Sequence, residues 1–169
     1  YSWMGYFRQN SYTGYRNVLS SQLQKNGFSM NGEFNVTNSK SITDKSVFWR
    51  PHLDIAKQLK KWNDITIGSR FDLEHNQVNS LQGDYLSFQS FSFNTLEFYA
   101  NTSAAKANKM GVSIIFRTDR SPDSTKFKKI DNSETVNIFG ELAKSIHHQL
   151  QWNLTYRNLK VADTTLAAQ

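Results

Sequence analysis

Charged side chains of both signs recur at alternate positions in the middle of this chain. They do so between Arg50 and Asp54 and again between Arg70 and Glu74. A spacing of two places side chains on one face of a β-strand, where such charges could line a conduit and set its solute preference. Because neighbouring opposite charges neutralise one another, we favour a satisfied ion-pair lattice over a solute-selective conduit. The residues expected to line this polar interior are Glu33, Arg50, His52, Asp54, Arg70, Asp72, Glu74, Arg117 and Arg157.

The four histidines do not point to metal binding or catalysis. His52 and His75 lack a ligand spacing and a third ligand beside them, and His147 and His148 lie at an expected tight turn. We place all four on polar faces or turns, away from the outer face where a lipid-hydrolysing Ser-His-Asn site would have to lie. Cysteine is absent, and so is a glycine-rich phosphate loop. The sequence therefore predicts a non-enzymatic protein without metal or cofactor.

The elements that position these charges are long strands with one apolar and one polar face. The segment Phe28–Thr37 alternates apolar and polar residues at nearly every position, which is the pattern of a half-buried strand. Similar alternation predicts nine strands, at residues 1–9, 14–25, 28–37, 46–60, 64–76, 86–100, 109–119, 134–144 and 148–161. Many of these exceed the roughly 9–11 residues that cross a bilayer. The fold class expected is an all-β, antiparallel, up-and-down transmembrane β-barrel.

The expected turns fix the register of two strand pairs. Asn26 and Gly27 are a strong hairpin signal, and a second turn is expected around Trp62. Pairing the strands about these turns predicts the polar pairs Arg50–Glu74, His52–Asp72, Asp54–Arg70, Gln22–Asn31 and Ser20–Glu33. The same registers predict the apolar pairs Leu53–Phe71, Leu59–Ile65, Leu23–Met30 and Leu19–Phe34. A slip by one residue would place charges opposite apolar side chains.

Connections of alternating length are expected between the strands. Short turns are predicted after residues 25, 60 and 144, and longer polar loops at 38–45, 77–85 and 120–133, as in outer-membrane barrels. A bulge is expected near Ser90, where the alternation changes phase. An odd number of strands cannot close as bacterial single-chain barrels do. We therefore expect residues 1–169 to form one segment of a larger barrel, incomplete at both ends.

The apolar faces and the aromatic residues are assigned to the bilayer. The residues expected to face lipid are Phe34, Leu53, Ile55, Ile67, Phe71, Ile114 and Leu154. Amphipathic rings favour membrane interfaces, and the expected aromatic girdle is Trp49, Trp62, Trp152 and Tyr156. The alternative use of these rings, stacking on sugars in a soluble lectin-like protein, is less compatible with their positions on apolar faces.

Composition limits the partners. The chain has 169 residues and a net charge of +6, but its basic residues are scattered. We interpret this charge as favouring anionic lipid headgroups, and we expect no nucleic-acid partner. The mean hydropathy is −0.61, and no apolar stretch approaches the ~20 residues of a transmembrane helix.

Two stretches resemble a known group of proteins. The run from Phe48 to Trp62, continuing through Gly68 to Asn76, and the run from His147 to Val161 are similar in style to large outer-membrane β-barrel proteins of Bacteroidota-type Gram-negative bacteria. The resemblance covers most of the chain without a protein-specific motif. It implies location in the bacterial outer membrane, contact with lipopolysaccharide, and possible membership of a membrane-protein complex. It supplies no catalytic residues.

Two functions follow from these patterns. The first is an integral outer-membrane barrel segment serving envelope transport, secretion or assembly, with further strands supplied by the same or another chain. The second is a soluble antiparallel barrel or sandwich that binds a small ligand or carbohydrate inside. The two differ in which face is the core, because a membrane barrel turns its apolar face outward.

Overall fold

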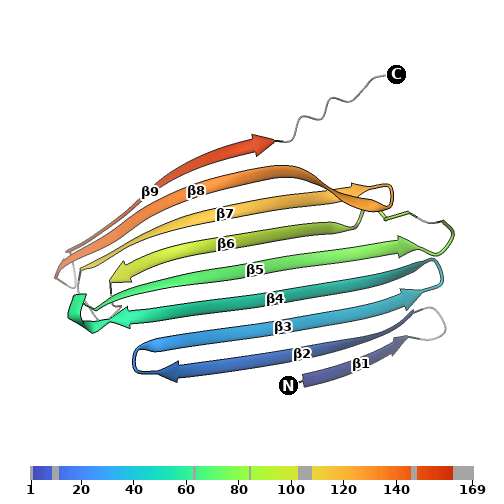
Figure 1. Cartoon of the computed structure of the whole chain (residues 1–169), viewed down its shortest axis with the longest axis horizontal. Coiled ribbons are helices and arrows are strands. Elements are labelled where there is room, and N and C mark those ends of the chain that lie inside the picture. The colour runs from blue at the N-terminus through green and yellow to red at the C-terminus, as the bar shows by residue number, and fades with distance from the viewer. Residues whose placement is uncertain are drawn as a thin grey trace.

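Alternating apolar and polar residues form one antiparallel sheet in the computed structural model of this chain (Figure 1). The structure describes residues 2–8, 12–62, 64–83, 85–102, 108–145 and 148–161. The strands are β1 (Ser2–Arg8), β2 (Tyr12–Lys25), β3 (Phe28–Ser41), β4 (Asp44–Leu59), β5 (Ile65–Ser80), β6 (Phe91–Thr102), β7 (Lys109–Asp123), β8 (Lys126–Ser145) and β9 (His148–Val161). They are hydrogen-bonded in the order of the sequence. The prediction of an antiparallel, up-and-down, all-β sheet is therefore confirmed.

The sheet is open in the described part of the chain. Its edges are β1, which pairs with β2, and β9, which pairs with β8. These nine strands form no closed barrel among themselves. A short 3-10 helix, η1 (Lys60–Trp62), follows β4, and no helix in the described ranges is long and apolar enough to cross a membrane.

The hairpin turns set the registers that the sequence predicts. Asn26 and Gly27 have φ angles of 51° and 74°, the two positive values that a type I′ turn requires. Leu19 lies opposite Phe34 across β2 and β3, and Asp54 lies opposite Arg70 across β4 and β5. The other predicted apolar and polar pairs of these two hairpins are also opposite each other or joined by an ion pair.

The predicted alternation of short and long connections is wrong at two places. Strand β3 continues to Ser41 and β4 begins at Asp44, so the loop expected at 38–45 is nearly all strand. Only Ser124 and Thr125 separate β7 from β8 where a loop was expected at 120–133. The polar residues at both places still pair through backbone hydrogen bonds, because these bonds do not require an apolar side chain on either face of the strand. The connections across 9–11, 103–107 and 146–147 lie outside the described residues.

The bulge expected near Ser90 is absent from β6. This strand begins at Phe91 and pairs with both neighbours without a shift in register. Ser90 lies before the strand, where its Oγ accepts a hydrogen bond from the Val78 amide and donates one to the Val78 carbonyl. The phase change arises because Phe91 and Phe93 stack on the polar side of the sheet, with ring centroids 4.9 Å apart. Register shifts occur instead between Asp119 and Arg120 and between Ala143 and Ser145.

The strands divide their side chains between two faces. We call the face that carries Phe34, Leu53 and Ile114 the apolar face, and the opposite face, which carries Asp54 and Arg70, the polar face. Apart from the two register shifts near the ends of β8, registers that are continuous from β2 to β9 keep each face consistent across the sheet.

Neither face is covered by a second layer in the described part of the chain. The buried hydrophobic residues there are only Ala56, Val78 and Leu86. Large apolar side chains remain exposed across the sheet, including Leu154, which is 64% exposed. A soluble domain buries its apolar face against another element, and this sheet does not.

Three glycines are each paired with an aromatic residue directly across the ladder: Gly68 with Tyr99, Gly111 with Phe139, and Gly140 with Trp152. In each pair the ring occupies the space where a glycine Cβ would lie. This arrangement is the aromatic rescue of strand glycines, which pins register in curved sheets.

The substitution Gly68→Ala tests this packing. A Cβ at Gly68 would meet the Tyr99 ring and lie 2.9 Å from the Ile55 carbonyl oxygen, so the ring or the backbone must shift. We expect a loss of roughly 1–3 kcal/mol in the free energy of unfolding, typical of overpacking. Urea unfolding of the intact protein, followed by tryptophan fluorescence, measures it.

Gly32→Ala is the matched control, because a Cβ there meets Leu53 Cδ1 at an ordinary 3.8 Å. This variant should stay within about 0.5 kcal/mol of the wild type. Equal losses in the two variants would contradict a specific role of the glycine–aromatic pair.

Candidate functional site

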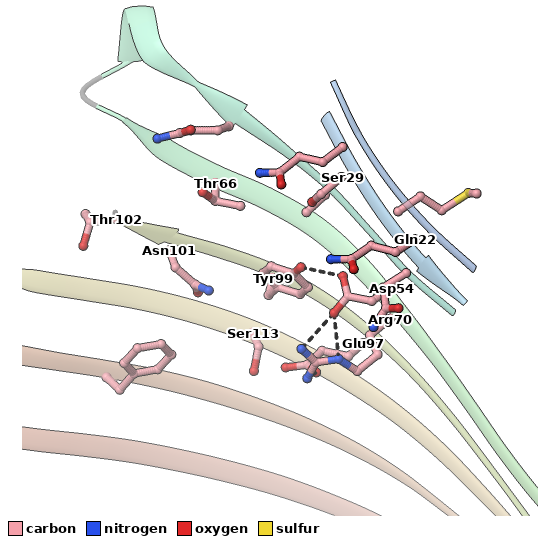
Figure 2. Close-up of a pocket in the computed structure, with 16 residues that line it drawn as sticks. Gln22, Ser29, Asp54, Thr66, Arg70, Glu97, Tyr99, Asn101, Thr102 and Ser113 are labelled. Carbon is pink, nitrogen blue, oxygen red and sulfur yellow. Dashed lines mark hydrogen bonds and ion pairs between the residues drawn. The ribbon is translucent and has the colours of Figure 1, made fainter. Parts of the chain in front are cut away.

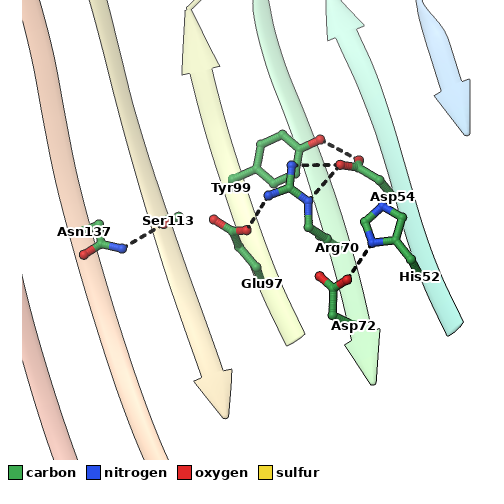
Figure 3. A network of polar contacts seen from close by, with 8 residues as sticks. All are labelled: His52, Asp54, Arg70, Asp72, Glu97, Tyr99, Ser113 and Asn137. Carbon is green, nitrogen blue, oxygen red and sulfur yellow. Dashed lines mark hydrogen bonds and ion pairs between the residues drawn. The ribbon is translucent and has the colours of Figure 1, made fainter. Parts of the chain in front are cut away.

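The centre of the polar face is a four-residue network drawn from three strands (Figure 3). Arg70 on β5 donates to Asp54 Oδ2 on β4 through Nε at 3.0 Å and Nη2 at 2.9 Å, and to Glu97 Oε2 on β6 through Nη1 at 3.1 Å. The Tyr99 hydroxyl donates to the other Asp54 oxygen at 2.8 Å. Two guanidinium nitrogens thus converge on one carboxylate oxygen of Asp54 while the third donates to Glu97, and such charge-assisted hydrogen bonds are stronger than neutral ones.

Two further pairs continue the lattice along β4 and β5. His52 Nδ1 lies 2.6 Å from Asp72 Oδ1, and Arg50 Nε lies 3.0 Å from Glu74 Oε1. These contacts follow from the register, because residues opposite each other on one face are close enough to pair. Six of the predicted polar residues are thus brought together in three cross-strand rows.

The remaining predicted polar residues lie on the same face but form no ion pair with these six. Arg117 pairs with Asp119 at 2.7 Å and lies over the Phe93 ring, 5.0 Å from its centroid. Glu33 lies opposite His52 in the register of β3 and β4, and Arg157 on β9 lies opposite Thr135 on β8. Both are exposed and have no ion pair within the described ranges.

Sequence reasoning missed two members of the central network, Glu97 and Tyr99. The signal was present, because Thr95, Glu97 and Tyr99 alternate with Leu96 and Phe98 along the chain. The expected phase change obscured it. Extending the later phase back through the whole of β6 would have placed both residues beside Arg70.

A cavity of about 700 Å³ lies on the polar face, next to this network (Figure 2). Amide and hydroxyl side chains contribute much of its wall, with the Asp54–Arg70–Glu97 network at one side and Phe139 at the other. Asn101 Oδ1 is buried there without a hydrogen-bond partner. Its lining comes from strands β2 to β8, so the polar face is the hollowed side of the sheet.

The residues predicted to face lipid share the apolar face. Cross-strand pairs join several of them, including Leu53 with Phe71, and row continuity places the rest on the same side. Most are more than one third exposed; these are Phe34, Leu53, Ile55, Ile67, Ile114 and Leu154.

Aromatic residues also gather on the apolar face. The rings of Phe34, Trp49, His75 and Phe127 form a chain, with successive centroids 6.5, 5.4 and 4.8 Å apart. The prediction that every histidine lies on a polar face or a turn is therefore wrong for His75. It lies opposite Trp49 in the register, and the polar end of β5 continues on both faces beyond Leu73.

The other predicted girdle residues occupy three different places. Trp152 covers Gly140 on the apolar face, and Tyr156 lies further along β9 on the same face. Trp62 ends η1 and is 70% exposed.

Of the two histidines expected at a tight turn, His147 lies outside the described residues, and His148 begins β9.

Comparison with protein-family models, with curated proteins and with solved structures finds no match to this chain. The arguments that follow therefore rest on the geometry of the two faces.

The substitution Arg70→Met tests the central network. It leaves the carboxylates of Asp54 and Glu97, on the two strands that flank β5, without the cation between them, and we expect a loss of roughly 1–3 kcal/mol in unfolding free energy. Adding Glu97→Gln should restore part of it, because the coupling belongs to the pair. Urea unfolding of the four variants of this cycle measures the coupling.

Arg157→Met is the control, since that guanidinium is exposed and has no ion pair in the described residues. It should change stability by less than about 0.5 kcal/mol. Strictly additive losses for Arg70→Met and Glu97→Gln would argue against a coupled lattice.

Proposed function

We propose that this chain is a section of a transmembrane β-barrel in a bacterial outer membrane, non-enzymatic, serving envelope transport, secretion or assembly. Its apolar face contacts lipid, including lipopolysaccharide, and its polar face lines the interior. The observation that carries the proposal is a sheet of nine mostly long strands with an apolar face that no described part of the chain covers. Exposed apolar area of this extent marks an interaction surface or a membrane contact.

The hollow on the polar face favours a membrane over a soluble barrel. A small soluble barrel fills its interior with apolar side chains, whereas here the cavity wall holds ion pairs and amides. In a membrane barrel the interior is polar and the outer surface apolar. The alternative of a soluble ligand-binding barrel needs the opposite arrangement of the two faces.

The slant of the apolar residues gives independent support. The outward apolar run of β2 centres on Leu19, and the hydrogen-bond register carried from Leu19 across the sheet reaches Lys160 on β9. The apolar run of β9 itself, Leu150–Tyr156, centres about seven residues earlier. Over the seven steps from β2 to β9 the apolar band thus shifts by about one residue per strand.

This shift corresponds to a strand tilt. One residue is about 3.3 Å along a strand and neighbouring strands are about 4.8 Å apart, so a band that is level in the membrane implies strands tilted by roughly 35°. Membrane barrels have strand tilts of about 35–45°. The apolar residues therefore form a level belt when the strands are given the tilt of a barrel.

The open edges define what the barrel still needs. Strands β1 and β9 each have one partner in the described structure, and unpaired strand edges are not tolerated in lipid. In this proposal further strands, from the same polypeptide or from a partner in a membrane complex, pair with both edges.

The substitution Leu154→Arg tests the membrane assignment. Leu154 lies near the middle of the apolar run of β9, and an arginine at the bilayer midplane costs roughly 2–4 kcal/mol. We expect a loss of this size in the stability of the intact protein folded into vesicles, and a weaker heat-modifiable band on a gel.

Asn153→Arg is the adjacent control on the polar face and should be mild. Equal tolerance of arginine at both positions would overturn the membrane proposal. Recovery of the intact protein in the soluble fraction would do the same and would point to the ligand-binding alternative.

A further inference from the structure

The two faces of the sheet differ sharply in charge. Among the described strand residues, the polar face carries ten carboxylates, four of which pair with arginines. The apolar face carries a single carboxylate in the described strands, Glu134, which pairs with Lys160 at 3.8 Å. Seven basic residues share that face; they are Lys25, Lys40, Lys45, Lys57, Arg120, Lys129 and Lys160. The excess positive charge of the chain is thus concentrated on the apolar face.

Two of these lysines form a like-charge pair at the border of the apolar band. Lys40 on β3 lies directly opposite Lys45 on β4, next to the Ile42–Thr43 bend. Side chains opposite each other have Cβ atoms about 4.5–5.5 Å apart, and like charges there are destabilising. Neither lysine has a carboxylate partner within the described ranges, so the pair lacks an anion.

The two lysines form part of the wall of a pocket. It has a volume of about 370 Å³, and its wall includes Thr13 and Tyr15 of β2 and Asn38 of β3. By the register of β2, β3 and β4, these side chains lie on the apolar face with the lysines. The pocket wall therefore carries two ammonium groups, a hydroxyl and an amide, which suit a group with several anionic oxygens such as a phosphate. The Tyr15 ring is also part of the wall.

The position of the pocket indicates the source of the anion. From Tyr15 toward the Asn26–Gly27 turn, the same face continues through Leu19 on β2 and Phe34 on β3, both exposed. A molecule with a phosphate in the pocket would therefore lay any attached hydrocarbon chain along apolar side chains. A free inorganic anion would leave that surface unused.

We propose that Lys40 and Lys45, with Thr13 and Asn38, bind the phosphate of an anionic membrane lipid whose acyl chains lie against Leu19 and Phe34. This proposal rests on the proposed membrane location of the apolar face. The anion removes the repulsion of the lysine pair. The pocket lies at the end of the sheet that carries the Ile42–Thr43 and Ser124–Thr125 connections. The proposal therefore places this end of the strands at the level of the lipid phosphates of one leaflet.

The test uses the intact protein in vesicles of phosphatidylcholine that contain spin-labelled phosphatidylglycerol or spin-labelled phosphatidylcholine. Electron paramagnetic resonance gives the relative association constant of each labelled lipid at the protein surface. We expect the wild type to prefer phosphatidylglycerol. The variant K40Q/K45Q should lose about fivefold of this preference for each lysine removed, the effect typical of a basic residue at a membrane surface.

The double variant K25Q/K57Q is the matched control, because it removes two basic residues from the same face at the opposite end of β2 and β4. Its preference for phosphatidylglycerol should stay within about twofold of the wild type. An equal loss in both double variants would show a diffuse charge effect and would overturn the assigned site.

Two further readouts separate the possible failures. Heat-modifiability of each variant reports insertion: if the wild type does not insert, the proposed function fails, whereas insertion without a lipid preference overturns this site alone. Inorganic phosphate added at millimolar concentration should not displace the labelled lipid. Displacement at that concentration would mean a site for a free anion and would contradict the lipid assignment.

Discussion

The alternation of side chains across a strand is the constraint on which the rest of this structure depends. Each strand sends successive residues to opposite faces, so one continuous register commits nine strands to the same apolar side. The ion-pair lattice, the uncovered apolar face and the separation of carboxylates from lysines are all consequences of it. A slip of one residue between β4 and β5 would place Arg70 opposite apolar side chains and break the central ion pairs.

The polar and apolar faces stabilise the sheet by different means. On the polar face, Arg70 joins three strands through short charge-assisted hydrogen bonds. Close packing of rings over Gly68 and Gly111 adds contacts between neighbouring strands on that side. On the apolar face the described residues make few contacts beyond their strand neighbours. Any free energy gained by burying these apolar side chains must therefore come from contact with molecules outside the sheet. The stability of this sheet therefore depends on interactions within the chain on the polar face and on the medium that contacts the apolar face.

Much of the fold could be predicted from the sequence because the pattern is local. The nine strands overlap the predicted ranges, and two hairpin registers were predicted residue by residue, since the expected turns at Asn26–Gly27 and around Trp62 fix the pairing. The ends of strands near Ser41 and Asp123 were missed, because polarity does not stop a backbone ladder. His75 was misplaced because the end of β5 is polar on both faces, and Tyr99 was missed because Phe91 and Phe93 place rings on the polar face at the start of β6.

The strictly sequential strand order has a consequence for how the molecule is made. Every ladder in the described sheet joins strands that follow one another along the chain, so each pairing closes only a short loop and costs little chain entropy. Proteins dominated by such local pairings fold fast for their size. The sheet can therefore grow one hairpin at a time from either side, each new strand using the last as its template. In the proposed barrel, the slow and entropically expensive event would be the one pairing that joins strands far apart in the sequence.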